Sequence, residues 1–190
     1  ESIIATVAKQ LLESLAFLHG QGIAHRDIRP SNILVCKDKK NGYTFKLANF
    51  HAGYQLQPQD NGTIRDMASL MFTEMDAIQW LAPEMIAHQE GDEETVVEYD
   101  LKCDVWSFGL TVWAMVSRTT PFPQNNTPED ILEKLISSDF QPSLNDYSNG
   151  EHSLLFDDFL RKCCCRDAKK RWSSEELLNH EFLTKSPQSP

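Results

Sequence analysis

The residues from His25 to Asn32 place a carboxylate, two guanidinium groups and a carboxamide within eight consecutive positions. Their order is His25-Arg26-Asp27-Ile28-Arg29-Pro30-Ser31-Asn32. Phosphoryl transfer uses groups of these kinds, because it needs a side chain that positions the nucleophile, charges that hold the phosphates, and correct alignment. An aspartate between an arginine and an isoleucine is, on its own, more often a surface ion-pair residue. The motifs that follow must therefore decide between the two interpretations.

The stretch resembles the catalytic loop of eukaryotic protein kinases, H-R-D-L-x-x-x-N, with an isoleucine in place of the leucine. Further landmarks follow in the order of that family. They are Asn49-Phe50-His51 at the place of Asp-Phe-Gly, Ala82-Pro83-Glu84, Asp104 to Gly109, and Arg171-Trp172. One short motif could arise by chance, but five in one order leave little room for coincidence.

The resemblance covers essentially the whole chain, but only the larger lobe of a kinase. No Gly-x-Gly-x-x-Gly loop and no Val-Ala-Ile-Lys strand precedes the loop. The implied fold is mainly α (α+β), a protein-kinase-like helical C-terminal lobe over residues 1–185 with a short β-hairpin, and the N-terminal lobe is absent from this chain. The catalytic loop would span 25–32 and the activation segment 49–84, and residues 186–190 would be a frayed tail.

The resemblance assigns roles to the loop residues. Asp27 would orient a substrate hydroxyl and accept its proton, and Asn32 would bind one magnesium ion. Arg29 stands where Ser/Thr kinases usually carry lysine and could contact the transferred phosphate, although its planar fork has a different reach. ATP and Mg²⁺ are the cofactors that these roles imply.

Three positions depart from the family pattern. Asn49 replaces the aspartate that bridges magnesium to ATP, so Asn32 and Asn49 would form a weakened metal and nucleotide site, because hard cations prefer anionic oxygens. His51 replaces a glycine and restricts the backbone there. Ala77 stands where sterile-20-like kinases carry a threonine whose hydroxyl contacts the catalytic aspartate. These departures suggest relaxed chemistry.

Other matching positions have structural roles in the family. His25 and Phe50 resemble members of the hydrophobic spine, and Asp104 would accept backbone hydrogen bonds from the catalytic loop. Glu84 and Arg171 resemble a buried ion pair, in which removal of one partner leaves an uncompensated charge. These five positions support a kinase fold without requiring catalysis.

The C-terminal part resembles sterile-20-like Ser/Thr kinases in residues 159–163 and 177–183. In that pattern Thr73 occupies the activating phosphorylation position, and Arg26 would pair with the phosphate. The alternative is that Thr73 is an ordinary loop threonine.

Hydrophobic periodicity and capping residues predict the elements that position these motifs. Residues 54–76 should be irregular. The stretch 88–100, with six acidic residues and no Lys or Arg, should be a solvated insert, or alternatively a docking site for a basic partner. The predicted elements are helices over 1–20, 104–115, 127–136 and 152–165 and one that begins at Ser173, together with strands over 33–36 and 43–48.

Composition excludes several function classes. The net charge of −10 argues against a general nucleic-acid binder, which needs a basic face. No apolar run reaches membrane-spanning length, and no signal peptide is visible. The five cysteines form no CxxC pair, which is typical of reduced thiols in a cytoplasmic protein, with a redox role as the minor alternative.

Two functions remain. The first is a pseudokinase, a kinase-shaped regulatory or scaffolding module that binds a protein partner. The second is an active Ser/Thr kinase that acts on a protein substrate with Asp27 and a weakened metal site. A third possibility is a helical half that exists naturally without its small lobe.

Overall fold

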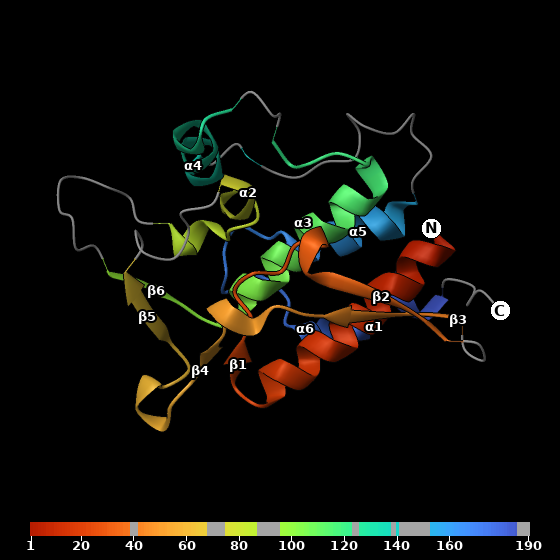
Figure 1. The fold of residues 1–190 in the computed structure, drawn as a ribbon, viewed down its shortest axis with the longest axis horizontal. Helices are drawn as coiled ribbons and strands as arrows, with labels where there is room; N and C mark the ends of the chain where they lie inside the picture. The colour runs from red at the N-terminus through yellow and green to blue at the C-terminus, as the bar shows by residue number, and fades with distance from the viewer. Residues whose placement is uncertain are drawn as a thin grey trace.

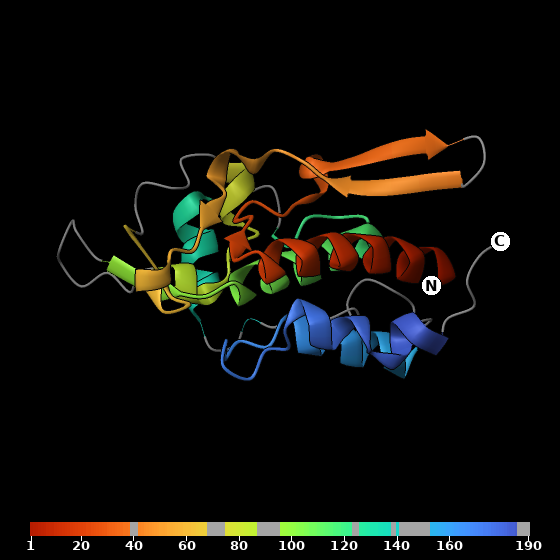
Figure 2. The same cartoon turned by 90° about the horizontal axis from the view of Figure 1, so that it is seen from below.

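Helix α1 (Ser2–Gly20) lies along the middle of the molecule. The computed structural model describes residues 1–38, 42–67, 75–86, 96–122, 126–137, 140 and 153–185. In the view of Figure 2, α1 is flanked on one side by a long hairpin and on the other by the C-terminal helices. The helix predicted over 1–20 is confirmed, and Val7, Leu11 and Leu15 lie on its buried face.

The hairpin consists of β2 (Ile33–Asp38) and β3 (Gly42–Leu47), paired antiparallel from Ile33 opposite Leu47 outward. The predicted strand over 33–36 ends two residues early, and the predicted strand over 43–48 is displaced by one residue toward the C-terminus. The hairpin follows the catalytic loop directly and precedes Asn49, so its register fixes the distance between the loop and Asn49. Figures 1 and 2 show it projecting along α1.

Helix α3 (Lys102–Ser117) is the buried centre of the fold, and every residue from Cys103 to Ala114 is shielded from solvent. It packs against α1 and α5 (Leu154–Cys163). Gly109 makes the contact with α5 possible, because a Cβ at this position would lie 2.6 Å from Cys163 Cβ and 2.6 Å from Cys164 Sγ. The predicted helix over 104–115 is confirmed, with two residues more at each end.

Three further helices begin at polar caps, and the sequence predicted the caps at Thr127 and Ser173. Thr127 caps α4 (Pro128–Ile136) and Ser173 caps α6 (Ser174–Leu178), both as capping boxes. Ser153 caps α5, whereas the first residue of the predicted helix, His152, lies outside the described residues. Two more short helices are α2 (Met75–Ile78) and α7 (Glu181–Lys185).

Two further antiparallel ribbons lie at the other end of the molecule from the hairpin tip (Figure 1). Strand β1 (Ile23–Ala24) pairs with β4 (Tyr54–Gln55), and β5 (Ile64–Met67) pairs with β6 (Val96–Tyr99). The prediction of irregular chain over 54–76 is therefore wrong for β4 and β5. Each strand gains its hydrogen bonds from a partner far away in sequence, which local patterns do not reveal.

The predicted solvated insert is also wrong at its C-terminal end. Val97 and Tyr99 are buried, while Val96 and Glu98 are exposed, as expected of a strand with one inner face. Residues 88–95 of the insert lie outside the described residues, as does the predicted tail 186–190.

The described structure mixes helices with small sheets, which agrees with the α+β expectation. The narrower expectation, that this chain is the C-terminal lobe alone, stays a prediction. Within the described ranges, no helix combines the length and the apolar composition needed to cross a membrane.

Candidate active site

Asp104, at the start of α3, anchors the catalytic loop by its backbone. Its two carboxylate oxygens accept hydrogen bonds of 2.7 Å from the backbone N–H groups of His25 and Arg26. His19, at the end of α1, also contacts Asp104, with 3.0 Å between Nε2 and Oδ2. Asp104 is completely buried, so these partners compensate for the removal of its charge from water. The loop is thereby fixed to both α1 and α3.

His25 fixes the other side of the loop. The Nε2 atom lies 3.0 Å from the carbonyl oxygen of Ala48, and Nδ1 accepts a 3.3 Å hydrogen bond from the backbone N–H of Asp27. These partners require the proton on Nε2. The Phe50 ring packs on the His25 ring with 4.7 Å between centroids, although Phe50 remains 48% exposed. This contact connects the catalytic loop to the segment that begins at Asn49.

Asp27 and Asn32 form the polar centre of the site, and both are buried. The amide nitrogen of Asn32 donates hydrogen bonds of 2.7 Å to the backbone oxygen and to Oδ2 of Asp27. Arg29 Nε lies 3.0 Å from Asp27 Oδ1 without the alignment of a hydrogen bond, so this contact is an ion pair. The three residues that the sequence grouped as catalytic are therefore in mutual contact.

Asn49 adds two side-chain contacts to the cluster of Asp27, Arg29 and Asn32. Its Nδ2 donates a 3.1 Å hydrogen bond to Asn32 Oδ1, and its own Oδ1 lies 2.8 Å from Nδ1 of His51. Asn49 is exposed, and its φ of 67° lies in the left-handed region that asparagine and aspartate tolerate. A continuous hydrogen-bonded chain therefore runs from His51 through Asn49 and Asn32 to Asp27.

This donor set does not fit a divalent cation. Asn49 turns an N–H group toward the oxygen of Asn32, where a cation needs oxygen ligands from both side chains. Both groups are neutral amides, and Asp27 Oδ2 already accepts a hydrogen bond from Asn32. Among the described residues, no group of at least three His, Cys, Asp or Glu side chains could hold a metal ion.

Ala77 lies in α2 and is buried, and its methyl group gives Asp27 no hydrogen-bond partner. The backbone of α2 continues into Trp80, whose carbonyl oxygen accepts a 2.7 Å hydrogen bond from the Ser107 hydroxyl on α3. The described residues before Ala82-Pro83-Glu84 are thus held by α3 through Trp80.

Arg26 has its own set of partners. Nε donates to the carbonyl oxygen of Ala52 at 2.5 Å, and Nη1 donates to Asp66 Oδ2 at 2.6 Å and to the Tyr99 hydroxyl at 3.1 Å. The guanidinium also lies over the Tyr54 ring, 5.5 Å from its centroid. Thr73, the partner that the sequence suggested, lies outside the described residues.

Glu84 and Arg171 form a buried ion pair. Arg171 Nη1 and Nη2 donate to the two Glu84 oxygens at 2.5 and 3.0 Å, and Arg171 also donates to the carbonyl oxygens of Lys102 and Cys165. Burial acts to lower the pKa of Arg171, but the hydrogen bonds and charge of Glu84 outweigh burial and raise it. The guanidinium is therefore held charged in the core.

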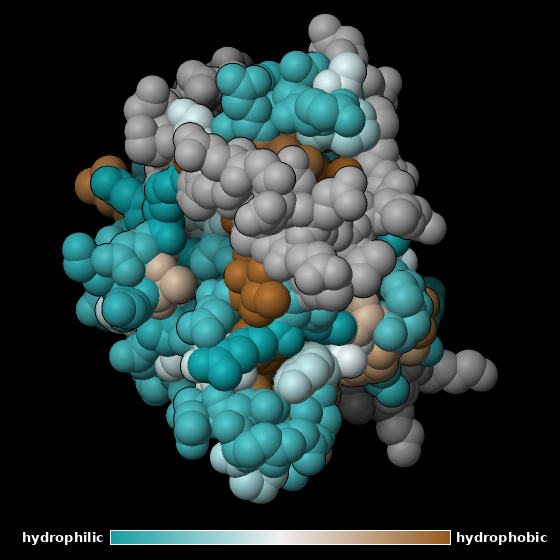
Figure 3. All heavy atoms as spheres, turned by 90° about the vertical axis from the view of Figure 1, so that its left-hand side faces the viewer, coloured by the Kyte–Doolittle hydropathy of each residue, from teal (hydrophilic) through white to brown (hydrophobic). Residues whose placement is uncertain are grey.

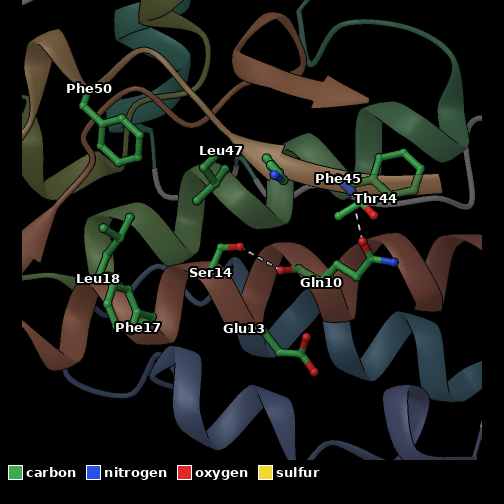
Figure 4. Close-up of a pocket in the computed structure, with 10 residues that line it drawn as sticks. Gln10, Glu13, Ser14, Phe17, Leu18, Thr44, Phe45, Leu47 and Phe50 are labelled. Carbon is green, nitrogen blue, oxygen red and sulfur yellow. Dashed lines mark hydrogen bonds between the residues drawn. The ribbon is translucent and has the colours of Figure 1, made fainter. Parts of the chain in front are cut away.

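A groove of about 610 Å³ lies between α1 and β3, beside Phe50 (Figure 4). Its walls are largely apolar, and Phe17 and Phe50 on its rim are 70% and 48% exposed. Gln10 bridges the walls, because its Oε1 accepts a 2.9 Å hydrogen bond from the backbone N–H of Phe45. Asp27, Asn32 and Asn49 do not line this groove. Phe50, which packs on His25, is the residue that connects the groove to the Asp27 centre.

Sequence reasoning missed four residues of the site. Asp66, Tyr99 and Tyr54 contact Arg26, and His19 contacts Asp104, which anchors the loop. The alternation of Val97 and Tyr99 was the available signal for β6. No local pattern indicates that Asp66 lies beside Arg26.

The family model for the protein kinase domain matches residues 1–183. The chain is 34% identical over 186 residues to Serine/threonine-protein kinase ppk11 of Schizosaccharomyces pombe, covering 97% of this chain and 51% of that protein. It is 30% identical over 188 residues to Ribosomal protein S6 kinase alpha-6 of Danio rerio, covering 98% of this chain and 23% of that protein. The chain therefore spans about half or less of the length of these relatives.

Proposed function

Because this chain belongs to the protein kinase domain family, we propose that it acts as a pseudokinase, a regulatory or scaffolding module in phosphorylation signalling. Its relatives include serine/threonine kinases, so the partner would be a protein of such a pathway. The observation that carries the proposal is the hydrogen bond from Asn49 Nδ2 to Asn32 Oδ1. It uses the oxygen that the family pattern assigns to magnesium.

A carboxylate at position 49 would add one negative charge and would have no N–H to donate to Asn32, so a cation would be needed between the two oxygens. The amide removes that need, because the two side chains satisfy one another. If replacing the family's aspartate by Asn49 raises the activation barrier as much as removing one transition-state stabiliser does, about 3 kcal/mol, the rate of phosphate transfer falls on the order of a hundredfold or more.

An active Ser/Thr kinase with a weakened site is the alternative, and the geometry of Asp27 favours it. Asp27 is held by Asn32 and Arg29 and retains a carboxylate that can accept a proton from a substrate hydroxyl. In this alternative ATP and Mg²⁺ would bind with help from parts of the parent protein beyond this chain.

The likeness to sterile-20-like kinases rests on residues 159–163 and 177–183. The description of this chain as a kinase C-terminal lobe rests on the missing glycine-rich motif. A cytoplasmic location is supported by five cysteines that are all free thiols.

The test is phosphate transfer from labelled ATP by the complete parent protein, in magnesium and in manganese. It is compared with Asp27→Asn and Asn49→Asp variants. Asn49→Asp keeps the left-handed backbone, since aspartate also tolerates it, so the variant should fold normally.

We expect the native protein to transfer no more phosphate than Asp27→Asn does, and Asn49→Asp to raise transfer. If the native protein transfers phosphate and Asp27→Asn abolishes this activity, the pseudokinase proposal fails and the chain is part of a weak kinase. Nucleotide binding, followed by the thermal shift on adding ATP with and without Mg²⁺, separates loss of binding from loss of chemistry.

A further inference from the structure

Arg26 directly precedes Asp27, so the backbone conformation at Arg26 sets the direction in which the chain enters Asp27. Its φ of 66° lies in the left-handed region, which is unfavourable for an arginine unless its surroundings hold it there. The guanidinium is attached to three segments beyond the loop, through Ala52, Asp66 and Tyr99. Whatever fixes this guanidinium also fixes the loop.

Asp66 is an unusual residue for its place in the ribbon. Ile64 and Asp66 share one face of β5, and Ile64 is fully buried, so this face points inward. The opposite face carries Arg65, whose exposed side chain pairs with Glu98 of β6 at 2.8 Å. Figure 3 shows that this end of the molecule is predominantly hydrophilic, so an acidic side chain could be solvated on the outer face. A carboxylate on the inner face instead requires a charged partner.

The pairing of Asp66 with Arg26 meets that requirement. The two side chains are only 27% and 10% exposed, and 2.6 Å separates Oδ2 from Nη1. Tyr99, opposite Ile64 in the ribbon, gives the same Nη1 a second acceptor. Burial is the main reason that the pKa of Tyr99 rises to about 12, so its hydroxyl stays neutral. Asp66 therefore supplies the negative charge that Arg26 pairs with, and Tyr99 supplies a neutral acceptor.

We propose that Asp66 is a positioning residue that serves as a permanent counter-charge for Arg26, ordering the β5–β6 ribbon and the catalytic loop without covalent modification. Added phosphate groups order such segments by forming new pairs with arginine. Here a carboxylate of the chain itself already makes that pair. The inference concerns order and not phosphate transfer, so it holds whether the domain is active or inactive.

Hydrogen exchange by mass spectrometry tests this on the complete, unphosphorylated chain. The amides of 64–67, 96–99 and 25–28 are followed in the wild type, Asp66→Asn, Asp66→Glu and Glu98→Gln. Glu98→Gln is the matched control, because it removes an acidic partner from the exposed face of the same ribbon.

We expect Asp66→Asn to accelerate exchange of these amides by about tenfold or more, because a shielded, charge-assisted pair is lost. Asp66→Glu should restore most of the protection, and Glu98→Gln should change exchange by less than about threefold. Thr73→Ala should exchange like the wild type. Circular dichroism and thermal melting of each variant establish that it is folded.

A double-mutant cycle with Arg26→Gln identifies the partner, since Asp66→Asn should add little once Arg26 is gone. The proposal is overturned if Asp66→Asn exchanges no faster than Glu98→Gln. It is equally overturned if the unphosphorylated wild type lacks protection over 64–67 and gains it only after Thr73 is phosphorylated. Neither outcome depends on catalysis, so the pseudokinase proposal is tested separately.

Discussion

The exchange of one carboxylate oxygen for an amide nitrogen at residue 49 changes what the neighbouring Asn32 can do. Asn32 uses its nitrogen to hold Asp27 and its oxygen to accept from Asn49. A side chain with both ends engaged in this way contributes to the stability of the site. The identity of residue 49 therefore determines which hydrogen bond the oxygen of Asn32 makes.

The buried ion pair of Glu84 and Arg171 gives the first prediction. Glu84→Gln removes the negative partner of a guanidinium whose side chain is 0% exposed, and the uncompensated charge should lower the free energy of unfolding by about 3 kcal/mol or more. Urea unfolding followed by circular dichroism measures the change. Glu98→Gln, which breaks the exposed pair with Arg65, should cost less than about 1 kcal/mol. Equal losses in the two variants would contradict this prediction.

The residues of the catalytic loop could be predicted from sequence because the motif is local. Asp27, Arg29 and Asn32 come from one short loop, and the structure brings them together as expected. The contribution of Asp66 could not be predicted, because it depends on a contact across forty positions.

At the scale of elements, the tight contact of α3 with α5 gives the second prediction. Gly109→Ala should destabilise the fold by about 1–3 kcal/mol, because the new methyl group would overlap Cys163 and Cys164. The gain from the better helix propensity of alanine, about 1 kcal/mol, does not offset this overlap fully. Gly20→Ala is the control, since a Cβ at the end of α1 meets nothing within 4 Å. Thermal unfolding should show a lower midpoint for Gly109→Ala alone.

The elements that neighbouring residues specify were predicted, and those that depend on residues far away in the sequence were not. The helices that begin at Thr127 and Ser173 were predicted because a cap and its acidic partner lie three positions apart. Strands β5 and β6 were missed because each is stabilised mainly by the other. The six acidic residues of 88–100 indicated that this segment is exposed to solvent. Val97 and Tyr99, which alternate with exposed residues, are instead buried in the core.

At the scale of the whole molecule, buried acidic groups that stay protonated set the response of the fold to alkaline pH. Burial raises the pKa of Cys103 and Cys163 well above the usual value of 9.0 and that of Cys164 to about 12. Above pH 9 the unfolded chain loses these protons while the folded chain keeps them. Stability is therefore complete below pH 9 and falls as pH rises toward 12.

The third prediction is the slope of that decline, about 1.4 kcal/mol per pH unit for each buried thiol. It is measured from urea midpoints between pH 7.5 and 10.5, a range chosen about the ordinary thiol pKa. Cys164→Ala should make the slope shallower, whereas Cys36→Ser, which alters an exposed thiol, should leave it unchanged. Stability that stays constant or rises across this range would contradict the prediction.

The ion pair of Arg171 also has a consequence for the lifetime of the native state. Arg171 lies 87 positions from Glu84 and 69 from Lys102, so these contacts close long loops and should form after the folding transition state. Most of the cost of Glu84→Gln should then appear as unfolding on the order of a hundredfold faster, with refolding little changed. Stopped-flow unfolding and refolding measure the two rates. Slower refolding at an unchanged unfolding rate would place the pair in the folding nucleus instead.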